Sequence, residues 1–216
     1  VQSPFPYKML SLHIEYCIKE AVTLLHNDGV ISYPTDTLYG LGASPFSSKA
    51  LSRVLEIKGR PRGKGLPLLL AEARDLERMA RVESDLALAL AQAFWPGPLT
   101  LVLPAVPEVP DEISGTNGTV GLRVPDHPIP RALAQALGGS IVGTSANPSG
   151  GPDPVTAQDV ERMLGHKKVD YILDGGPAYR GLPSTVVDLT GPKPRLVRIG
   201  ALNRESIEEV CGVCLE

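Results

Sequence analysis

The chain has 216 residues, of which 43% are hydrophobic and 21% charged, and its formal net charge is −3. This length and balance are typical of a globular protein with its own core, and the overall charge is not that of a protein that binds a long polyanion. The 21 prolines and 22 glycines indicate many loops without reaching the share that is typical of disorder.

The cysteine content and the hydrophobic pattern favour a cytoplasmic protein. There are three cysteines, and the first residues, VQSPFPYKML, do not form a secretion signal. No apolar run approaches the roughly 18 residues of a membrane-spanning helix. We therefore expect a cytoplasmic location and no membrane span.

Helical and strand-like segments alternate along the chain. In chain order the pattern predicts a helix at 11–29, a strand at 30–35, a helix at 47–59, a strand at 66–71, helices at 72–81 and 84–94, strands at 99–105 and 118–125, a helix at 128–139, a strand at 140–147, a helix at 156–165, strands at 169–176, 184–190 and 195–200, and a helix at about 204–213. No long polar linker interrupts this series. The sequence predicts one α/β domain over 1–216, with a mixed parallel and antiparallel sheet flanked by helices.

The segment KGRPRGKG, residues 58–65, places a cation at every second position. Lys58, Arg60, Arg62 and Lys64 are separated only by glycine and proline. Pro61 disfavours the helical region for the residue before it, so we expect an extended segment with all four charges on one side. Because aligned cations repel one another, the pattern indicates a compact anion such as a triphosphate, although a solvated basic loop is the alternative.

Polar residues follow two predicted strands. YPTDTLYGLG, residues 33–42, brings Thr35, Asp36 and Thr37 to a strand end. SIVGTSANPSGG, residues 140–151, brings Thr144, Ser145 and Asn147 to another. Ligands of open α/β sheets bind at such ends, although an Asx or Thr turn is the alternative for the first segment. Neither segment is a GxSxG elbow, and the chain has no P-loop motif.

Arg123 lies in a strand-like segment, GTVGLRVP. With a period of two, Val120, Leu122 and Val124 share one face, whereas Gly121 and Arg123 share the other. An arginine among apolar neighbours needs an anionic partner, which is either an internal carboxylate or a substrate carboxylate. The pair CGVC, Cys211 and Cys214, has no second pair or nearby histidine and does not predict a zinc site.

Five segments in this order, YPTDTLYGLG, KGRP, TVGLRVPDHP, TSANPSG and LPSTVVDL, resemble the YrdC/Sua5 family of threonylcarbamoyl-AMP synthases. The similarity runs from about residue 12 to 205, and the chain resembles the short form without the C-terminal domain of Sua5. It implies a YrdC-like fold with a large, positively charged concave cleft. It also implies an enzyme that joins L-threonine, bicarbonate and ATP into threonylcarbamoyl-AMP and releases pyrophosphate. A separate transferase complex then modifies adenosine 37 of tRNA, and weak tRNA binding is an open possibility.

The positions that match the family motifs imply two groups of site residues. Lys58 and Arg60 match a Lys-x-Arg that contacts the nucleotide phosphates, and we expect both to act in catalysis by stabilising charge there. The expected ATP-binding residues are Lys58, Arg60, Arg62, Lys64, Thr119, Ser145, Asn147, Asp153, Ser184 and Arg198. The expected threonine-binding residues are Thr35, Arg123 and Thr144.

The chain departs from the family pattern at two points. Lys64-Gly65-Leu66 stands where Lys-Pro-Leu is common, and Asp153-Pro154-Val155 stands where Ser-Pro-Thr is common. An acid beside phosphates is unfavourable unless a metal bridges them, so the role of Asp153 is open. We expect Mg²⁺ to accompany ATP and to be held mainly by the phosphates, with no metal ligand assigned in the protein.

Two other functions are compatible with parts of this pattern. A non-catalytic RNA-binding module could use a basic cleft, although the net charge and the lack of interleaved aromatic residues count against it. An enzyme that forms a carbamoyl-adenylate for another pathway is the second alternative. Turnover that depends on threonine separates both from the synthase.

Overall fold

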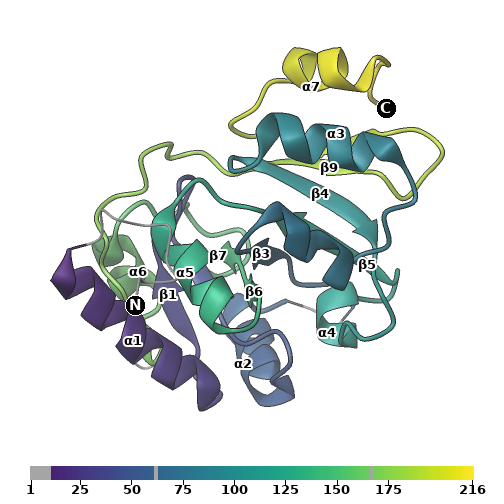
Figure 1. Cartoon of the computed structure of the whole chain (residues 1–216). Helices are drawn as coiled ribbons and strands as arrows, with labels where there is room; N and C mark the ends of the chain where they lie inside the picture. The colour runs from purple at the N-terminus through teal and green to yellow at the C-terminus, as the bar shows by residue number, and fades with distance from the viewer. Residues whose placement is uncertain (1–10, 61–62, 166–167) are drawn as a thin grey trace, which may run out of the picture.

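The computed structural model of the chain describes residues 11–60, 63–165 and 168–216 (Figure 1). The helices are α1 (Leu12–His26), α2 (Ser48–Lys58), η1 (Ala73–Arg78, a 3₁₀ helix), α3 (Asp85–Phe94), α4 (Asp111–Ser114), α5 (Pro128–Ala136), α6 (Ala157–Met163) and α7 (Arg204–Cys211). The strands are β1 (Ile31–Tyr33), β2 (Gly40–Gly42), β3 (Leu68–Leu70), β4 (Leu99–Pro104), β5 (Thr119–Arg123), β6 (Ser140–Val142), β7 (Thr144–Ser145), β8 (Tyr171–Ile172), β9 (Thr185–Asp188) and β10 (Arg195–Arg198). None of the described helices is long and apolar enough to cross a membrane.

The strands form two mixed sheets. One sheet has the order β7-β2-β1-β8, and the other has the order β10-β9-β4-β5-β3-β6. Both contain parallel and antiparallel pairs; for example, β4 pairs antiparallel with β5 and parallel with β9. The expected mixed α/β fold flanked by helices is therefore confirmed, with the strands divided between two sheets instead of one.

A shared apolar core joins the two sheets beneath α1 and α5. Ile31 and Tyr33 from β1 belong to the same buried cluster as Leu69 from β3 and Ile141 from β6. The hydroxyl of Tyr33 donates to the carbonyl oxygen of Val142 at 2.7 Å, which adds a polar link between the sheets. A larger cluster fills the space between the strands and α2, α3 and α7, and Figure 1 shows α7 packed over α3 at the C-terminal end.

Local signals explain most of the helix boundaries. The hydroxyl of Ser11 accepts from the backbone N–H of Ile14 and caps α1, as its sequence position predicts. Gly59 adopts a left-handed conformation with φ 58° and ends α2. His127 caps α5, which has proline in its first turn.

Three local predictions were wrong. The helix predicted at 72–81 is the short 3₁₀ helix η1, which begins with a capping box between Glu72 and Asp75. The strand predicted at 140–147 is two strands in different sheets, β6 and β7, separated at Gly143. The short elements β2 and α4 were not predicted, since three or four residues carry too little periodicity.

Candidate functional site

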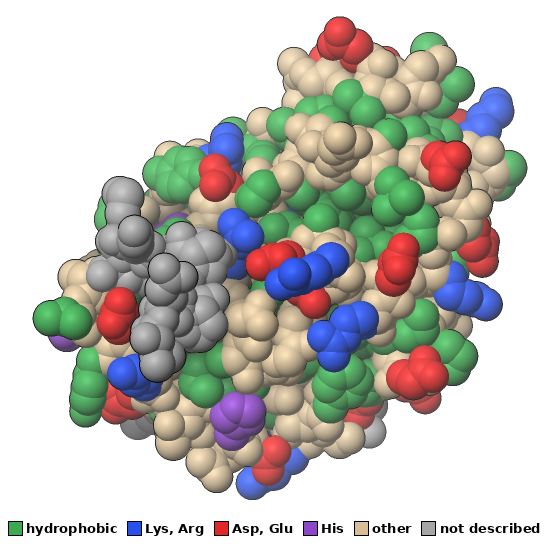
Figure 2. Space-filling model, viewed as in Figure 1, with side chains coloured by type: hydrophobic (Ala, Val, Ile, Leu, Met, Phe, Trp, Pro, Cys, Tyr) green, Lys and Arg blue, Asp and Glu red, His purple; other side chains and the backbone are tan. Residues whose placement is uncertain are grey.

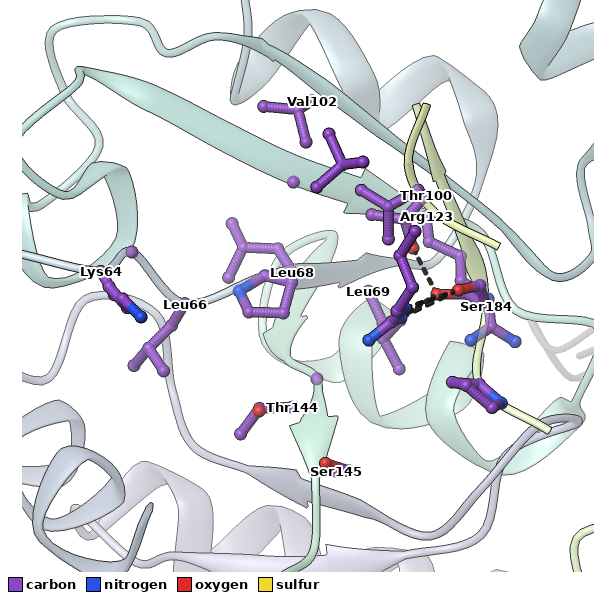
Figure 3. Close-up of a pocket in the computed structure, with 18 of the residues that line it drawn as sticks. Lys64, Leu66, Leu68, Leu69, Thr100, Val102, Arg123, Thr144, Ser145 and Ser184 are labelled. Carbon is purple, nitrogen blue, oxygen red and sulfur yellow. Dashed lines mark hydrogen bonds between the residues drawn. The ribbon is translucent and has the colours of Figure 1, made fainter. Parts of the chain in front are cut away.

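A cavity of about 710 Å³ opens between the two sheets. Strands β3, β4, β5, β9 and β10 contribute from the larger sheet, and β2 and β7 contribute from the smaller one. Figure 3 shows Lys64 on one side of this cavity, Arg123 and Ser184 on the opposite side, and Thr144 and Ser145 along a third side. The volume is in the range of about 300–1,000 Å³ that is usual for small-molecule sites.

Side chains alternate along the strands between the face of the sheet that lines the cavity and the face that packs in the core. Thr100 and Val102 of β4 line the cavity, while Leu101, between them, is fully buried in the core. Likewise, Gly121 and Arg123 of β5 face the cavity and Leu122 faces the core, which confirms the two faces predicted for this segment. The sheet therefore presents one polar face to the cavity without interrupting its apolar face.

Basic side chains outnumber acidic ones around the cavity. The described residues that line it include five basic ones, Arg60, Lys64, Arg123, Arg195 and Arg198, and two acidic ones, Asp153 and Asp188. The guanidinium of Arg195 pairs with the Asp188 carboxylate at 2.8 Å, so this pair is nearly neutral. The excess of positive charge favours an anionic ligand.

Lys58 does not belong to an extended row of cations. It is the last residue of α2, and Gly59 reverses the chain in the left-handed region, so the backbone N–H of Arg60 donates to the carbonyl oxygen of Leu55 at 3.0 Å. The predicted extended conformation was therefore wrong at Lys58 and Gly59, because Lys58 is helical and Gly59 ends the helix in the left-handed region. Arg62 lies outside the described residues.

The side chain of Lys58 is buried behind the cavity wall. Its Nζ donates to the carbonyl oxygens of Ser145 and Asn147 at 2.6 and 2.7 Å, to Ser145 Oγ at 3.2 Å, and to Asn147 Oδ1 at 2.9 Å. Burial, together with the neighbouring Arg60 charge, lowers the pKa of the Lys58 ammonium to about 8, while the Asp153 charge opposes this shift. Lys58 and Asn147 do not line the cavity themselves, whereas Ser145 does.

The loop after β7 is built around these donors and acceptors. Ser145 Oγ donates to Asn147 Oδ1 at 2.7 Å, and the Asn147 amide donates to the carbonyl oxygens of Gly151 and Pro152. Every polar group of the Asn147 side chain is therefore engaged within the loop. Lys58 and Asn147 hold the loop so that Ser145 lies at the cavity surface.

The loop after β1 forms a buried polar cluster with Arg123. The Arg123 guanidinium pairs with the Asp36 carboxylate and donates to Thr37 Oγ1 and the carbonyl oxygen of Gly97, both at 2.8 Å. Asp36 is fully buried, and Arg123 is 5% exposed. Burial lowers the pKa of the Arg123 guanidinium, and the Asp36 charge opposes this shift. Of the two anionic partners expected for Arg123, the structure thus contains the internal carboxylate, which is that of Asp36.

Thr35 faces the same part of the cavity with its hydroxyl already engaged. Thr35 Oγ1 donates to the carbonyl oxygen of Leu38 at 2.6 Å and accepts from the backbone N–H of Thr37 at 3.1 Å. These bonds close the turn predicted as the alternative for this segment. A ligand beside Thr35 would meet an oxygen acceptor rather than a free hydroxyl proton.

A third polar group lies where β4, β9 and β10 meet. Ser184 Oγ and Thr100 Oγ1 are 2.8 Å apart, and Arg198 donates to the carbonyl oxygen of Ser184 through Nε at 3.1 Å and Nη2 at 2.9 Å. Burial lowers the pKa of Arg198, and Asp153 raises it. The predicted residues Ser184, Arg198 and Asp153 are therefore brought to one region although they are far apart in the sequence.

Most of the predicted site residues gather around this one cavity. Those that line it are Thr35, Arg60, Lys64, Thr119, Arg123, Thr144, Ser145, Asp153, Ser184 and Arg198. Thr37, from the candidate segment at 33–42, lines it as well, and so do Thr100, Asp188 and Arg195, which the sequence did not single out. A hydroxyl inside an apolar strand was the available signal for Thr100, and an acid seven residues before an arginine was the signal for Asp188 and Arg195.

The described residues contain no cluster of three or more His, Cys, Asp or Glu side chains that could hold a metal ion by themselves. Asp153 and Asp188 are the carboxylates at the cavity surface. Mg²⁺ usually binds one or two carboxylates together with substrate phosphates and water, and these side chains fit that limited contribution. The thiols of Cys17, Cys211 and Cys214 are not joined in disulfides.

A cavity lined by arginines and hydroxyl groups, in an α/β fold, is typical of proteins that bind small polyanions. Residues 23–200 match the profile of the Sua5/YciO/YrdC family, which is described as Telomere recombination. The chain belongs to the Sua5/YciO/YrdC family.

Two relatives are similar in sequence to this chain over most of its length. It is 40% identical over 198 residues to the threonylcarbamoyl-AMP synthase of Pyrococcus abyssi, with 92% of this chain and 58% of that protein covered. It is 38% identical over 196 residues to the Bacillus subtilis protein of the same name, with 90% and 56% covered. The chain thus spans less than two thirds of the length of these two relatives.

Solved structures share the fold. P. abyssi Sua5 complexed with L-threonine matches with a TM-score of 0.88 at 39% identity, covering 94% of this chain and 59% of that one. E. coli YciO matches with a TM-score of 0.79 at 31% identity, covering 89% and 93%.

Proposed function

We propose that this protein is an L-threonylcarbamoyladenylate synthase that uses L-threonine, bicarbonate and ATP. The observation that carries the proposal is one cavity lined both by basic and hydroxyl side chains suited to a nucleotide and by Thr35 and Arg123. The relatives named threonylcarbamoyl-AMP synthase, and the Sua5 structure with L-threonine, support the same assignment. A volume of about 710 Å³ is sufficient for two substrates that must react with each other.

The nucleotide would lie along the basic side of the cavity. Arg60 and Lys64 would contact the phosphates, and Ser145 would donate its hydroxyl to them. Lys58 would contribute its charge from behind the loop, so its role would combine positioning Ser145 with stabilising the phosphates. On the opposite side, Ser184, Thr119 and Arg198 would hold the rest of the nucleotide.

L-Threonine would lie against the Arg123 cluster. The three contacts of Arg123 leave further N–H groups of its guanidinium for the carboxylate of the amino acid. Thr35 and Thr144 would line the same end of the cavity. This arrangement would leave the amine of threonine directed toward the nucleotide.

The reaction would need positioning more than covalent help from the protein. The deprotonated amine of threonine would add to CO₂ with loss of a proton, or to bicarbonate with loss of water, to give N-carboxythreonine. Its carboxylate would then attack the α-phosphorus of ATP, and the bond from that phosphorus to the leaving pyrophosphate would break. Arg60 and Lys64 would stabilise the charge that develops on the phosphates, and Arg123 would fix the distance between the reactants. Mg²⁺ bound with ATP would neutralise phosphate charge, and Asp153, with or without Asp188, would supply protein oxygen atoms to it.

The deciding experiment measures pyrophosphate release from ATP with threonine or bicarbonate omitted one at a time. We expect release only when both are supplied. Release without threonine would contradict the assignment and would favour an enzyme that forms another carbamoyl-adenylate. No release with all substrates, together with salt-sensitive RNA binding, would favour the RNA-binding alternative.

The product would pass to a separate tRNA threonylcarbamoyl transferase complex in the cytoplasm, since the adenylate is an activated intermediate. Direct tRNA binding would be weak at most. On the face seen in Figure 2, the coloured Lys and Arg side chains are interspersed with Asp and Glu instead of forming one basic surface. The mixed charge of this face does not favour an extended nucleic acid there.

A further inference from the structure

Asp36 is shared by two arginines that belong to different parts of the chain. Its Oδ1 pairs with Nη2 of Arg123, and its Oδ2 lies 3.5 Å from Nε of Arg180. Asp36 is fully buried, whereas the Arg180 side chain is 34% exposed. Among the described residues, no donor makes a hydrogen bond of good geometry to Oδ2, so the Arg180 charge is its compensating neighbour.

The second arginine changes the charge of the cluster. With Arg123 and Asp36 alone, the two charges would cancel at close range, and a carboxylate in the cavity would meet a nearly neutral pair. With Arg180 on the far side of Asp36, the three groups together carry one net positive charge. Arg123 is the member that lines the cavity, so the excess charge is available there.

The segment that carries Arg180 holds it against this cluster. The backbone N–H of Arg180 donates to the carbonyl oxygen of Asp36 at 3.1 Å. The neighbouring Tyr179 ring lies 5.3 Å from the Arg180 guanidinium carbon, and the Tyr179 hydroxyl donates to Asp126 Oδ2 at 3.1 Å. Arg180 is therefore oriented by its backbone and by an adjacent ring, although it does not line the cavity.

We propose that Arg180 is a positioning residue for the amino-acid substrate: by sharing Asp36 it leaves Arg123 with the net charge that binds the substrate carboxylate. This inference rests on the proposed function, in which Arg123 meets the carboxylate of L-threonine. Arg180 acts through Asp36 and Arg123 and makes no contact with the reacting atoms.

The test compares Arg180→Gln with the wild-type protein in steady-state turnover and in calorimetric binding of L-threonine. We expect the KM and the Kd for L-threonine to rise about tenfold, which corresponds to about 1.4 kcal/mol. The KM for ATP and kcat should change less than about twofold, because Arg180 does not line the cavity and acts through Asp36 on Arg123. Arg180→Lys keeps the charge and should recover most of the affinity for threonine.

Arg53→Gln is the matched control. Arg53 has the same exposure of 34%, pairs with a different aspartate, Asp170, and does not line the cavity. We expect it to leave the KM for threonine unchanged, and thermal unfolding of each variant verifies folding.

Three results would overturn the proposal. The first is an unchanged affinity for threonine in Arg180→Gln, and the second is a loss of affinity in Arg180→Lys as large as that in Arg180→Gln. The third is the absence of a cooperative thermal transition in both Arg180 variants, which would make Arg180 a structural residue. A wild-type protein that binds no threonine would contradict the proposed function itself and is thereby distinguished from these results.

Discussion

Nζ of Lys58, at the end of α2, donates to both the carbonyl oxygen and Oδ1 of Asn147, at 2.7 and 2.9 Å. The two residues are 89 positions apart. The contact joins the basic segment to the loop that contains Ser145. The Lys58 side chain, which was expected to contact the ligand, therefore points at the backbone of this loop. The protonation state of Lys58 therefore bears on the geometry of the loop as well as on the charge of the site.

We expect ATP affinity to fall as the pH rises through about 8, the pKa to which burial lowers Lys58. Above this pH the amine loses its proton, and with it a positive charge and one of its donors. Lys58→Met should bind ATP about tenfold more weakly at neutral pH and lack this alkaline decrease. Calorimetric titration with ATP from about pH 6.5 to 9.5 measures both effects. Identical pH profiles in the two proteins would show that another group is responsible.

Asp36→Asn should strongly destabilise the fold. The substitution leaves Arg123, which is 5% exposed, without its carboxylate, and an unpaired buried charge typically costs about 3–5 kcal/mol. The free energy of unfolding in denaturant measures the loss. Glu83→Gln is the control, because Glu83 pairs with Arg81 at 4.0 Å on the surface and should matter by less than about 1 kcal/mol. Equal effects would contradict the buried pair.

His127→Asn should reduce the acid sensitivity of the fold. Burial lowers the pKa of His127 to about 4, from an ordinary value of about 6.5, so the unfolded chain binds a proton at a pH where the folded one does not. The free energy of unfolding is therefore unaffected by this proton above pH 6.5, and it decreases as the pH falls from 6.5 toward 4.

Asparagine can still cap α5, so the variant should keep the helix and lose this part of the pH dependence. Denaturant unfolding of both proteins between about pH 7 and 4 provides the comparison. Parallel curves would mean that His127 does not contribute to this dependence.

Gly143→Ala should destabilise the junction between the two sheets. A Cβ atom at this position would lie 2.3 Å from Cγ of Leu69, a core side chain, so one of them must move. Overpacking of this kind costs about 1–3 kcal/mol. Gly191→Ala, where the nearest atom would lie at 3.8 Å, should be close to neutral in the same unfolding measurement. A neutral Gly143→Ala variant would show that Leu69 has room to move.

Asp153→Asn should raise the Mg²⁺ concentration needed for half-maximal pyrophosphate release. The carboxylate lines the cavity, and its charge acts on both Lys58 and Arg198. If it contributes an oxygen to Mg²⁺ bound with ATP, the amide should bind the ion more weakly. An unchanged Mg²⁺ requirement would assign Asp153 only to balancing the basic residues.

Much of the fold could be predicted from the sequence because its signals are local. The cap of α1 at Ser11, the end of α2 at Gly59, and the two faces of β5 each depend on residues that are neighbours in the chain. The polar residues after β1 and around β7 could be named as candidates for the same reason. The break at Gly143 could not, because β6 and β7 pair with strands of different sheets, β3 and β2, and this pairing is long-range.

The sequence by itself determined which residue types stand at the ends of strands and helices, and hence predicted a mixed α/β fold and candidate residues for binding an anion. Only the tertiary structure decided which of them face the cavity. Lys58 was expected at the ligand, but the carbonyl groups of a distant loop surround its ammonium. Arg123 was expected to need an anion, and the pairing of Asp36 with both Arg123 and Arg180 follows from long-range packing. A charged group pairs with the opposite charge that lies near it in space, and local sequence patterns do not show which distant residues will be near.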